Sequence, residues 1–135
     1  MNRVDDKIQE IEKLLEELES ILPIDFEEYL NSLKIKAAGE RYLEKIIATI
    51  VDLAFLIIKE KKLKIPEEEK EAFDTLAVSN IISQELCERL KDAKGMRNII
   101  AHEYGKVNDE LVFYSLKEEL IKDSQDFIKQ ISKIK

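Results

Sequence analysis

The stretch between residues 46 and 58 constrains this chain more than any other. It is 13 residues long and apolar except for Thr49 and Asp52. A membrane span needs roughly 18 apolar residues, so the stretch is too short to cross a bilayer. Its apolar side chains would point to nearly every side of a helix, and such a helix must be covered all round. A single chain rarely covers a helix completely in a small bundle, so we expect a second copy of the chain on the outer face.

Five helices are predicted, over residues 5–22, 25–62, 67–78, 84–101 and 109–133. Apolar positions recur at helical spacing in the first and last of these, and no segment alternates with period two. Only three Gly and two Pro interrupt the chain. The pattern predicts an all-α fold, an antiparallel bundle with short loops, in one domain over residues 1–135.

Residues that typically cap helices stand at the expected boundaries. Asp25 and Ser83 are placed to cap the N-termini of the second and fourth helices, and Asn108 or Asp109 that of the last. Asn80 suits the C-terminal cap of the third helix. These positions divide the chain without any long loop.

Composition excludes several classes of function. Hydrophobic residues make up 44% and charged residues 38%, as expected of a globular protein, and the net charge is −7. A generic nucleic-acid binder is usually basic, so any nucleic-acid role must come from a local site. Cys87 is the single cysteine, which excludes an intrachain disulfide and favours a reducing, cytoplasmic location. We see no secretion signal, membrane segment or cofactor motif.

Four side chains suited to phosphodiester chemistry crowd together near residue 100. They are Arg97, Asn98, His102 and Tyr104. A guanidinium offers a rigid fork of donors that matches phosphate oxygens, and an imidazole titrates near neutral pH. The amide and the phenol can bind or orient a neighbouring group. The chain has only one histidine, so a proton-transfer role for imidazole falls on His102.

Helical geometry decides which of these side chains can meet. Asn98 and His102 are four residues apart and are direct neighbours, whereas Arg97 and His102 are five apart and lie on different sides of a regular helix. Arg97 and His102 can cooperate if the helix ends near His102, or if a two-fold axis brings in the residues of a second copy. Gly95 fits such an axis, because a glycine permits close approach of two backbones.

The motif resembles the HEPN superfamily, specifically the HepT-like toxins of HepT/MntA type VII toxin–antitoxin systems. Their signature is Arg-X4-His-X-Tyr, usually beginning Arg-Asn, and Arg97, Asn98, His102 and Tyr104 match it position for position. The predicted order of helices also fits, with a long second helix, a short third, the motif at the end of the fourth and a final helix.

The resemblance implies a metal-independent endoribonuclease with a composite site at a homodimer interface. His102 would handle protons, Arg97 would stabilise charge on the phosphorane, and Asn98 would support the site. An MntA-like nucleotidyltransferase would adenylylate Tyr104 with ATP and so silence the toxin, because AMP adds bulk and negative charge where an RNA phosphate binds.

Each of these residues also has a structural interpretation. His102 could interact with the dipole at a helix C-terminus, and Arg97 could form a surface salt bridge with Glu103 or another acidic neighbour. Tyr104 could pack its ring and hydrogen-bond its hydroxyl. The run Glu67-Glu68-Glu69 is most simply the negatively charged first turn of the third helix, after Pro66.

Asp52 and Arg41 are further candidates on the second helix. Asp52 interrupts the apolar stretch, so we expect it to be buried or at an interface, where its charge needs a partner. Arg41 lies three turns earlier, close to the same face. Either residue could line a dimer cleft, although a structural pairing of Asp52 is slightly favoured. No metal site is expected, since one His and one Cys offer no ligand spacing.

Two functions remain in competition. The first is an endoribonuclease toxin that acts as a homodimer on RNA. The second is a non-catalytic helical module that binds a nucleotidyltransferase partner or a nucleotide, an alternative that the acidic net charge favours mildly.

Overall fold

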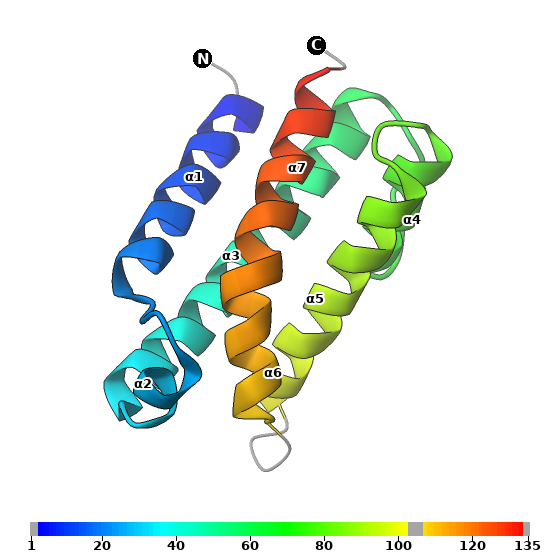
Figure 1. The fold of residues 1–135 in the computed structure, drawn as a ribbon. Coiled ribbons are helices and arrows are strands. Elements are labelled where there is room, and N and C mark those ends of the chain that lie inside the picture. Colours follow the sequence, from blue (N-terminus) through cyan, green and yellow to red (C-terminus); the bar gives the residue numbers. More distant parts are fainter. Residues whose placement is uncertain (1–2, 103–106, 134–135) are drawn as a thin grey trace.

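The computed structural model describes residues 3–102 and 107–133, and these residues form helices without any β-strand. The helices run alternately down and up a bundle, so that both ends of the chain lie at the same end of the molecule (Figure 1). Their bounds are α1 Arg3–Ile21, α2 Phe26–Leu30, α3 Leu33–Glu60, α4 Glu71–Val78, α5 Gln84–His102, α6 Asp109–Tyr114 and α7 Ile121–Ser132. The predicted all-α fold is confirmed.

Local hydrogen bonds explain most of the helix boundaries. Asp25, Ser83 and Asn108 each accept backbone N–H groups two or three residues further on, at 3.0 to 3.1 Å. Asn80 adopts the left-handed conformation, with a φ of 62°, just after α4 ends. These caps confirm the boundaries predicted from the sequence.

Three boundaries differ from the prediction. The long second helix is interrupted at Asn31 and Ser32, where the Ser32 hydroxyl caps α3 by accepting the N–H of Ile35 at 3.2 Å. The short α2 that results places Tyr29 against Phe113 of α6, with ring centroids 5.1 Å apart. The helix predicted to begin near residue 67 begins only at Glu71. The last helix contains a π-helical segment, Ser115–Leu120, between α6 and α7.

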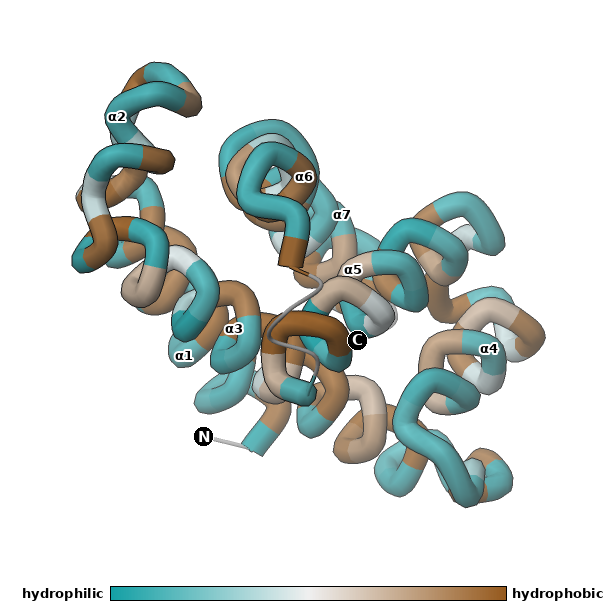
Figure 2. The backbone as a smooth tube through the Cα atoms, turned by 90° about the horizontal axis from the view of Figure 1, so that it is seen from below, coloured by the Kyte–Doolittle hydropathy of each residue, from teal (hydrophilic) through white to brown (hydrophobic). Residues whose placement is uncertain are grey.

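The chain itself covers most of the apolar stretch of α3. In Figure 2, α3 lies between α1 and α5, with α2 and α4 at opposite edges, and α1, α4 and α5 all pack on α3. Within the stretch, Asp52 is exposed and three apolar side chains, Ala48, Phe55 and Leu56, are half-buried. The buried residues of the stretch, Thr49 among them, are Ile46, Ile47, Thr49, Ile50, Val51, Leu53, Ala54, Ile57 and Ile58. The chain thus covers most of this helix by itself, and a second copy on its outer face stays a prediction.

Asp52 is not buried in this chain, and its expected place at an interface between two chains stays a prediction. Its side chain is 62% exposed in this chain, and its Oδ2 atom lies 3.6 Å from Lys7 Nζ of α1. The carboxylate falls on the narrow strip of α3 that the other helices leave uncovered, so water and one lysine satisfy its charge. An exposed ion pair of this kind contributes little to stability.

Among the described residues, no helix combines the length and the apolar character that a membrane span requires.

Candidate functional site

The last turns of α5 carry the described part of the motif. Arg97, Asn98 and His102 all lie within this helix, which stays helical up to His102. Tyr104 lies outside the described residues, as does Glu103, the possible salt-bridge partner of Arg97. Asn98 and His102 are both exposed and one turn apart, as predicted.

Arg97 and His102 lie on different sides of α5. Five residues of a regular α-helix turn through about 500°, which leaves the two side chains about 140° apart around the axis. Arg97 is on the side that packs against the rest of the chain and its side chain is only 26% exposed, whereas His102 is exposed. One chain alone does not bring the guanidinium and the imidazole together on one face of this helix.

Arg97 is held by a carboxylate from outside α5. Its NH1 atom lies 3.5 Å from Glu69 Oε1, and Lys94 Nζ lies 3.3 Å from the same oxygen. Glu69 belongs to the connector between α3 and α4 rather than to the first turn of a helix. Sequence reasoning missed both Glu69 and Lys94. The available signal was the spacing of Lys94 and Arg97, which places two cations on one face of α5.

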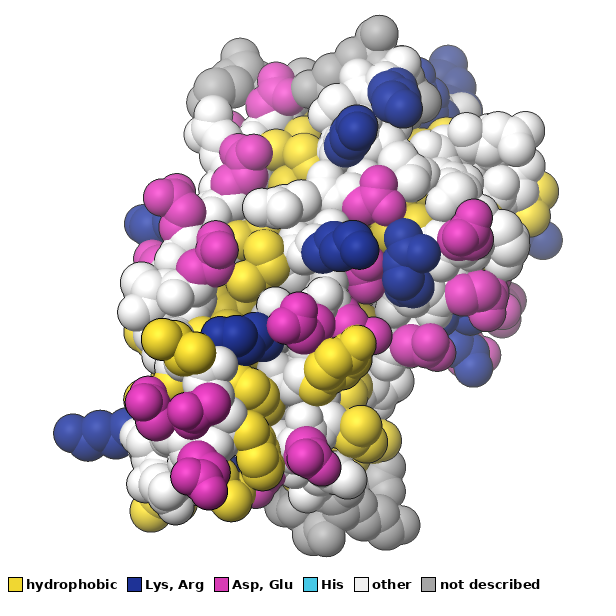
Figure 3. Space-filling model, viewed as in Figure 1, with side chains coloured by type: hydrophobic (Ala, Val, Ile, Leu, Met, Phe, Trp, Pro, Cys, Tyr) yellow, Lys and Arg dark blue, Asp and Glu magenta, His cyan; other side chains and the backbone are white. Residues whose placement is uncertain are grey.

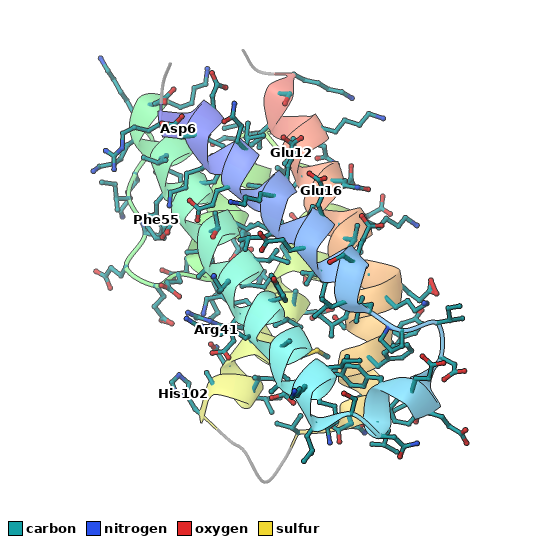
Figure 4. All side chains as sticks on the ribbon, turned by 90° about the vertical axis from the view of Figure 1, so that its left-hand side faces the viewer. Asp6, Glu12, Glu16, Arg41, Phe55 and His102 are labelled. Carbon is teal, nitrogen blue, oxygen red and sulfur yellow. The ribbon has the colours of Figure 1, made fainter. Side chains whose placement is uncertain are left out.

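Arg41 lies on the exposed surface of α3. In Figure 4, the side chains of Arg41 and His102 occupy the same lower edge of the molecule, one from α3 and the other from the end of α5. Asp52, three turns beyond Arg41 on α3, pairs with Lys7. The placement of Arg41 suits a contact with an extended anionic ligand that also reaches His102.

An apolar groove runs beside the motif between α5 and α6. It has a volume of about 400 Å³, and Gly95, Met96, Ile99, Leu111 and Val112 are among its lining residues. A Cβ atom added at Gly95 would meet nothing within 4 Å, so the backbone of α5 is open to an approaching group there. In Figure 3, hydrophobic atoms also gather at the lower end of the molecule, around α2 and α6. Uncovered apolar surface of this kind is typical of contact sites.

Three potential metal-ligand atoms, from Asp74, Cys87 and Glu88, lie within 4.8 Å of one another. The ammonium of Lys91 lies beside this cluster, 3.1 Å from Asp74 Oδ1 and 3.9 Å from Glu88 Oε2. Burial, together with the hydrogen bond that the thiol donates to Asp74, raises the pKa of Cys87 to about 11. The ammonium of Lys91 thus lies between the two carboxylates, and the thiol donates to one of them.

Comparison with known families decides the class of this chain. The family described as ribonuclease HepT-like matches residues 11–133. The chain belongs to this family. The match spans all helices from the middle of α1 onward, and it includes the motif at the end of α5.

Two curated relatives of this HepT-like chain are nucleases. The chain is 33% identical over 86 residues to the mRNA nuclease HepT of Shewanella oneidensis, a match that covers 64% of each protein. It therefore spans just under two thirds of that relative. It is 26% identical over 113 residues to the tRNA nuclease HepT of Aphanizomenon flos-aquae, which covers 84% of this chain and 77% of the relative.

A solved structure extends the similarity to the whole fold. It is described as the tri-AMPylated Shewanella oneidensis HEPN toxin in complex with MNT antitoxin. It superposes on this HepT-like chain with a TM-score of 0.90 at 25% identity, covering 98% of this chain and 99% of the other. The two proteins thus share the whole helical bundle.

Proposed function

We propose that this HepT-like chain is a metal-independent endoribonuclease, the toxin of a toxin–antitoxin pair. The observation that carries the proposal is that the last turns of α5 present two suitable side chains. Arg97 is half-buried and held by a carboxylate, and His102 is exposed. Membership of the family and two nuclease relatives support the same reaction class.

The two side chains have distinct roles in the proposed reaction. The 2′-hydroxyl of the RNA attacks the adjacent phosphorus atom, and the bond to the 5′-oxygen of the next nucleotide breaks. His102 takes the proton from the attacking 2′-hydroxyl and returns a proton to the leaving 5′-oxygen. Arg97 donates hydrogen bonds to the phosphorane oxygens, where negative charge develops. Asn98 supports His102 from one turn earlier. The products are a 2′,3′-cyclic phosphate and a 5′-hydroxyl, and no step requires a metal ion.

The active unit in this proposal is a homodimer. Within one chain, Arg97 and His102 lie about 140° apart around α5, so a second copy must bring the complementary side chain. The open backbone at Gly95 and the apolar groove beside it leave room for such a contact near the motif. Arg41 would line the cleft and bind a neighbouring phosphate, and Asp52 would lie at its far edge.

Cleavage of RNA in the presence of EDTA tests the catalytic claim. The wild-type protein is expected to cleave, and His102→Ala and Arg97→Ala are expected to lose at least about 100-fold in rate, in the range typical of lost acid–base or charge-stabilising groups. Arg3→Ala is the matched control, since Arg3 is an exposed cation at the start of α1, at the opposite end of the bundle from His102. Equal inactivity of wild type and His102→Ala on diverse RNAs would reject catalysis and favour a non-catalytic module that binds a nucleotidyltransferase or a nucleotide.

A mixture of two inactive variants tests the shared site. If Arg97 of one chain works with His102 of the other, mixing Arg97→Ala with His102→Ala restores part of the cleavage, because a mixed dimer contains one intact pair. A site contained within one chain gives no restoration. Light scattering on the same samples should show a dimer, and a monomer at micromolar concentration would contradict the shared cleft.

Regulation by adenylylation is the second part of the proposal. An MntA-like nucleotidyltransferase would transfer AMP from ATP to the Tyr104 hydroxyl and release pyrophosphate. The AMPylated toxin bound to its MNT antitoxin among the structural relatives supports this step. Mass spectrometry after co-expression should detect AMP on the wild type and on Tyr114→Phe, which removes an exposed phenol elsewhere in the chain, but not on Tyr104→Phe. An unmodified Tyr104 beside an active partner would refute it.

A further inference from the structure

Two cations of α5 share one carboxylate oxygen. Glu69 Oε1 lies 3.3 Å from Lys94 Nζ and 3.5 Å from Arg97 NH1. Lys94 and Arg97 are three residues apart on the same face of α5, and Glu69 comes from the connector before α4. The carboxylate therefore links a segment remote in the sequence to the arginine of the motif.

The three side chains of this cluster differ strongly in burial. The side chain of Lys94 is 11% exposed, that of Arg97 26% and that of Glu69 52%. A buried ammonium needs a counter-charge close by, so Lys94 holds the carboxylate of Glu69 in place. The held carboxylate in turn restricts the long side chain of Arg97, which otherwise loses considerable rotamer entropy whenever it binds a phosphate.

The charges balance so that Arg97 keeps its attraction for an anion. Lys94 compensates the carboxylate, and the cluster of three retains one net positive charge. The ion pair uses the NH1 end of a guanidinium that carries five N–H donors in a rigid fork. The remaining donors stay suitable for phosphate oxygens.

We infer that Glu69 is a positioning residue for Arg97, and that Lys94 fixes Glu69 and cancels its charge. This inference rests on the proposed function of Arg97 as the group that stabilises the phosphorane. Pre-alignment of the guanidinium lowers the cost of reaching the transition state and acts on turnover more than on binding of RNA.

Kinetics of three variants test the inference. Glu69→Ala is expected to lower kcat by about 10- to 100-fold with little change in KM, the range seen when a group that orients a functional side chain is lost. Glu69→Gln should recover part of the loss, because its amide oxygen still accepts from the guanidinium. Glu68→Ala is the matched control, since it removes the same charge from an exposed position one residue earlier.

Faster cleavage by Glu69→Ala would overturn the inference. If Glu69 instead competed with RNA for Arg97, Glu69→Ala would lower KM and raise the cleavage rate. Unchanged kinetics in an active enzyme would refute a positioning role equally. The double variant Glu69→Ala/Lys94→Met distinguishes a loss of folding from a loss of positioning, because it removes the buried ammonium together with its partner. Its stability should recover while kcat stays low.

A measurement without RNA keeps this inference distinct from the proposed function. The heteronuclear NOE of the Arg97 Nε–Hε group, assigned with Arg97→Lys, reports the order of the guanidinium on the fast timescale. It should be high in the wild type, low in Glu69→Ala and intermediate in Glu69→Gln. An unchanged value in Glu69→Ala would refute positioning even if the wild type cleaves RNA. A clear drop in a protein that cleaves no RNA would support positioning and reject the catalytic proposal alone.

Discussion

The two described helix-interior glycines should respond in opposite ways to the same substitution. A Cβ atom at Gly39 of α3 would lie 2.9 Å from Leu116 Cδ1 and 3.3 Å from Tyr29 Cε1, whereas one at Gly95 of α5 would meet nothing within 4 Å. Alanine gains about 1 kcal/mol over glycine in a helix, and overpacking a tight core costs about 1–3 kcal/mol. Gly95→Ala should therefore stabilise by about 1 kcal/mol, and Gly39→Ala should destabilise by about 1 kcal/mol.

Thermal and urea denaturation, followed by circular dichroism, check these values. An unfolding entropy of about 2.1 cal/mol/K per residue converts 1 kcal/mol in a chain of this length into a Tm change of about 3–4 °C. The experiment should be run over a range of protein concentrations. If Gly95→Ala lowers the Tm only at the protein concentrations at which the chain self-associates, a second backbone lies against Gly95. A stabilised Gly39→Ala, or a destabilised Gly95→Ala in dilute monomer, would refute the packing argument.

Three further substitutions or treatments test the core and its polar contacts. Tyr29→Phe should leave stability unchanged or raise it by up to about 1 kcal/mol, because the buried hydroxyl has no hydrogen-bond partner within residues 3–102 and 107–133; a loss above about 1 kcal/mol would contradict this. Cys87 should resist a thiol reagent at pH 8 until the protein is denatured, since its pKa is raised to about 11 by burial and by Asp74; rapid labelling of the native protein would contradict this. Arg89→Ala should cost about 1–2 kcal/mol in urea denaturation, because it strands the nearly buried carboxylate of Asp123, which Arg89 Nε contacts at 2.9 Å; a loss below about 0.3 kcal/mol would show that water replaces the guanidinium.

Helix boundaries could be predicted where a hydrogen bond joins close neighbours in the chain. Asp25, Ser83 and Asn108 cap N–H groups within three residues, so their identity was sufficient. The interruption at Ser32 is also a local cap, but the long apolar pattern that follows it obscured the signal. The interruption lets Tyr29 pack on Phe113. These residues are 84 positions apart, so no pattern of neighbouring residues predicts the contact.

The arrangement of the motif's side chains could be predicted, because the spacing of residues on a helix fixes their directions around its axis. The positions of Arg97 and His102 on different sides of α5 follow from the number of residues between them, and the structure keeps them there. The expectation that Asp52 is buried was wrong, because its exposure depends on which helices pack around α3.

The amino-acid order alone thus determined the helices, their caps and the side chains available for chemistry, since these depend on neighbours within about one or two turns. Tertiary structure decided which carboxylate meets Arg97. Glu69 lies 28 residues before it, in a run of three glutamates that are equivalent in sequence, and only the path of the connector brings one of them to α5. Electrostatic contacts act over a few ångströms in space, and the distance between two residues along the chain does not specify that separation once the chain has turned back on itself.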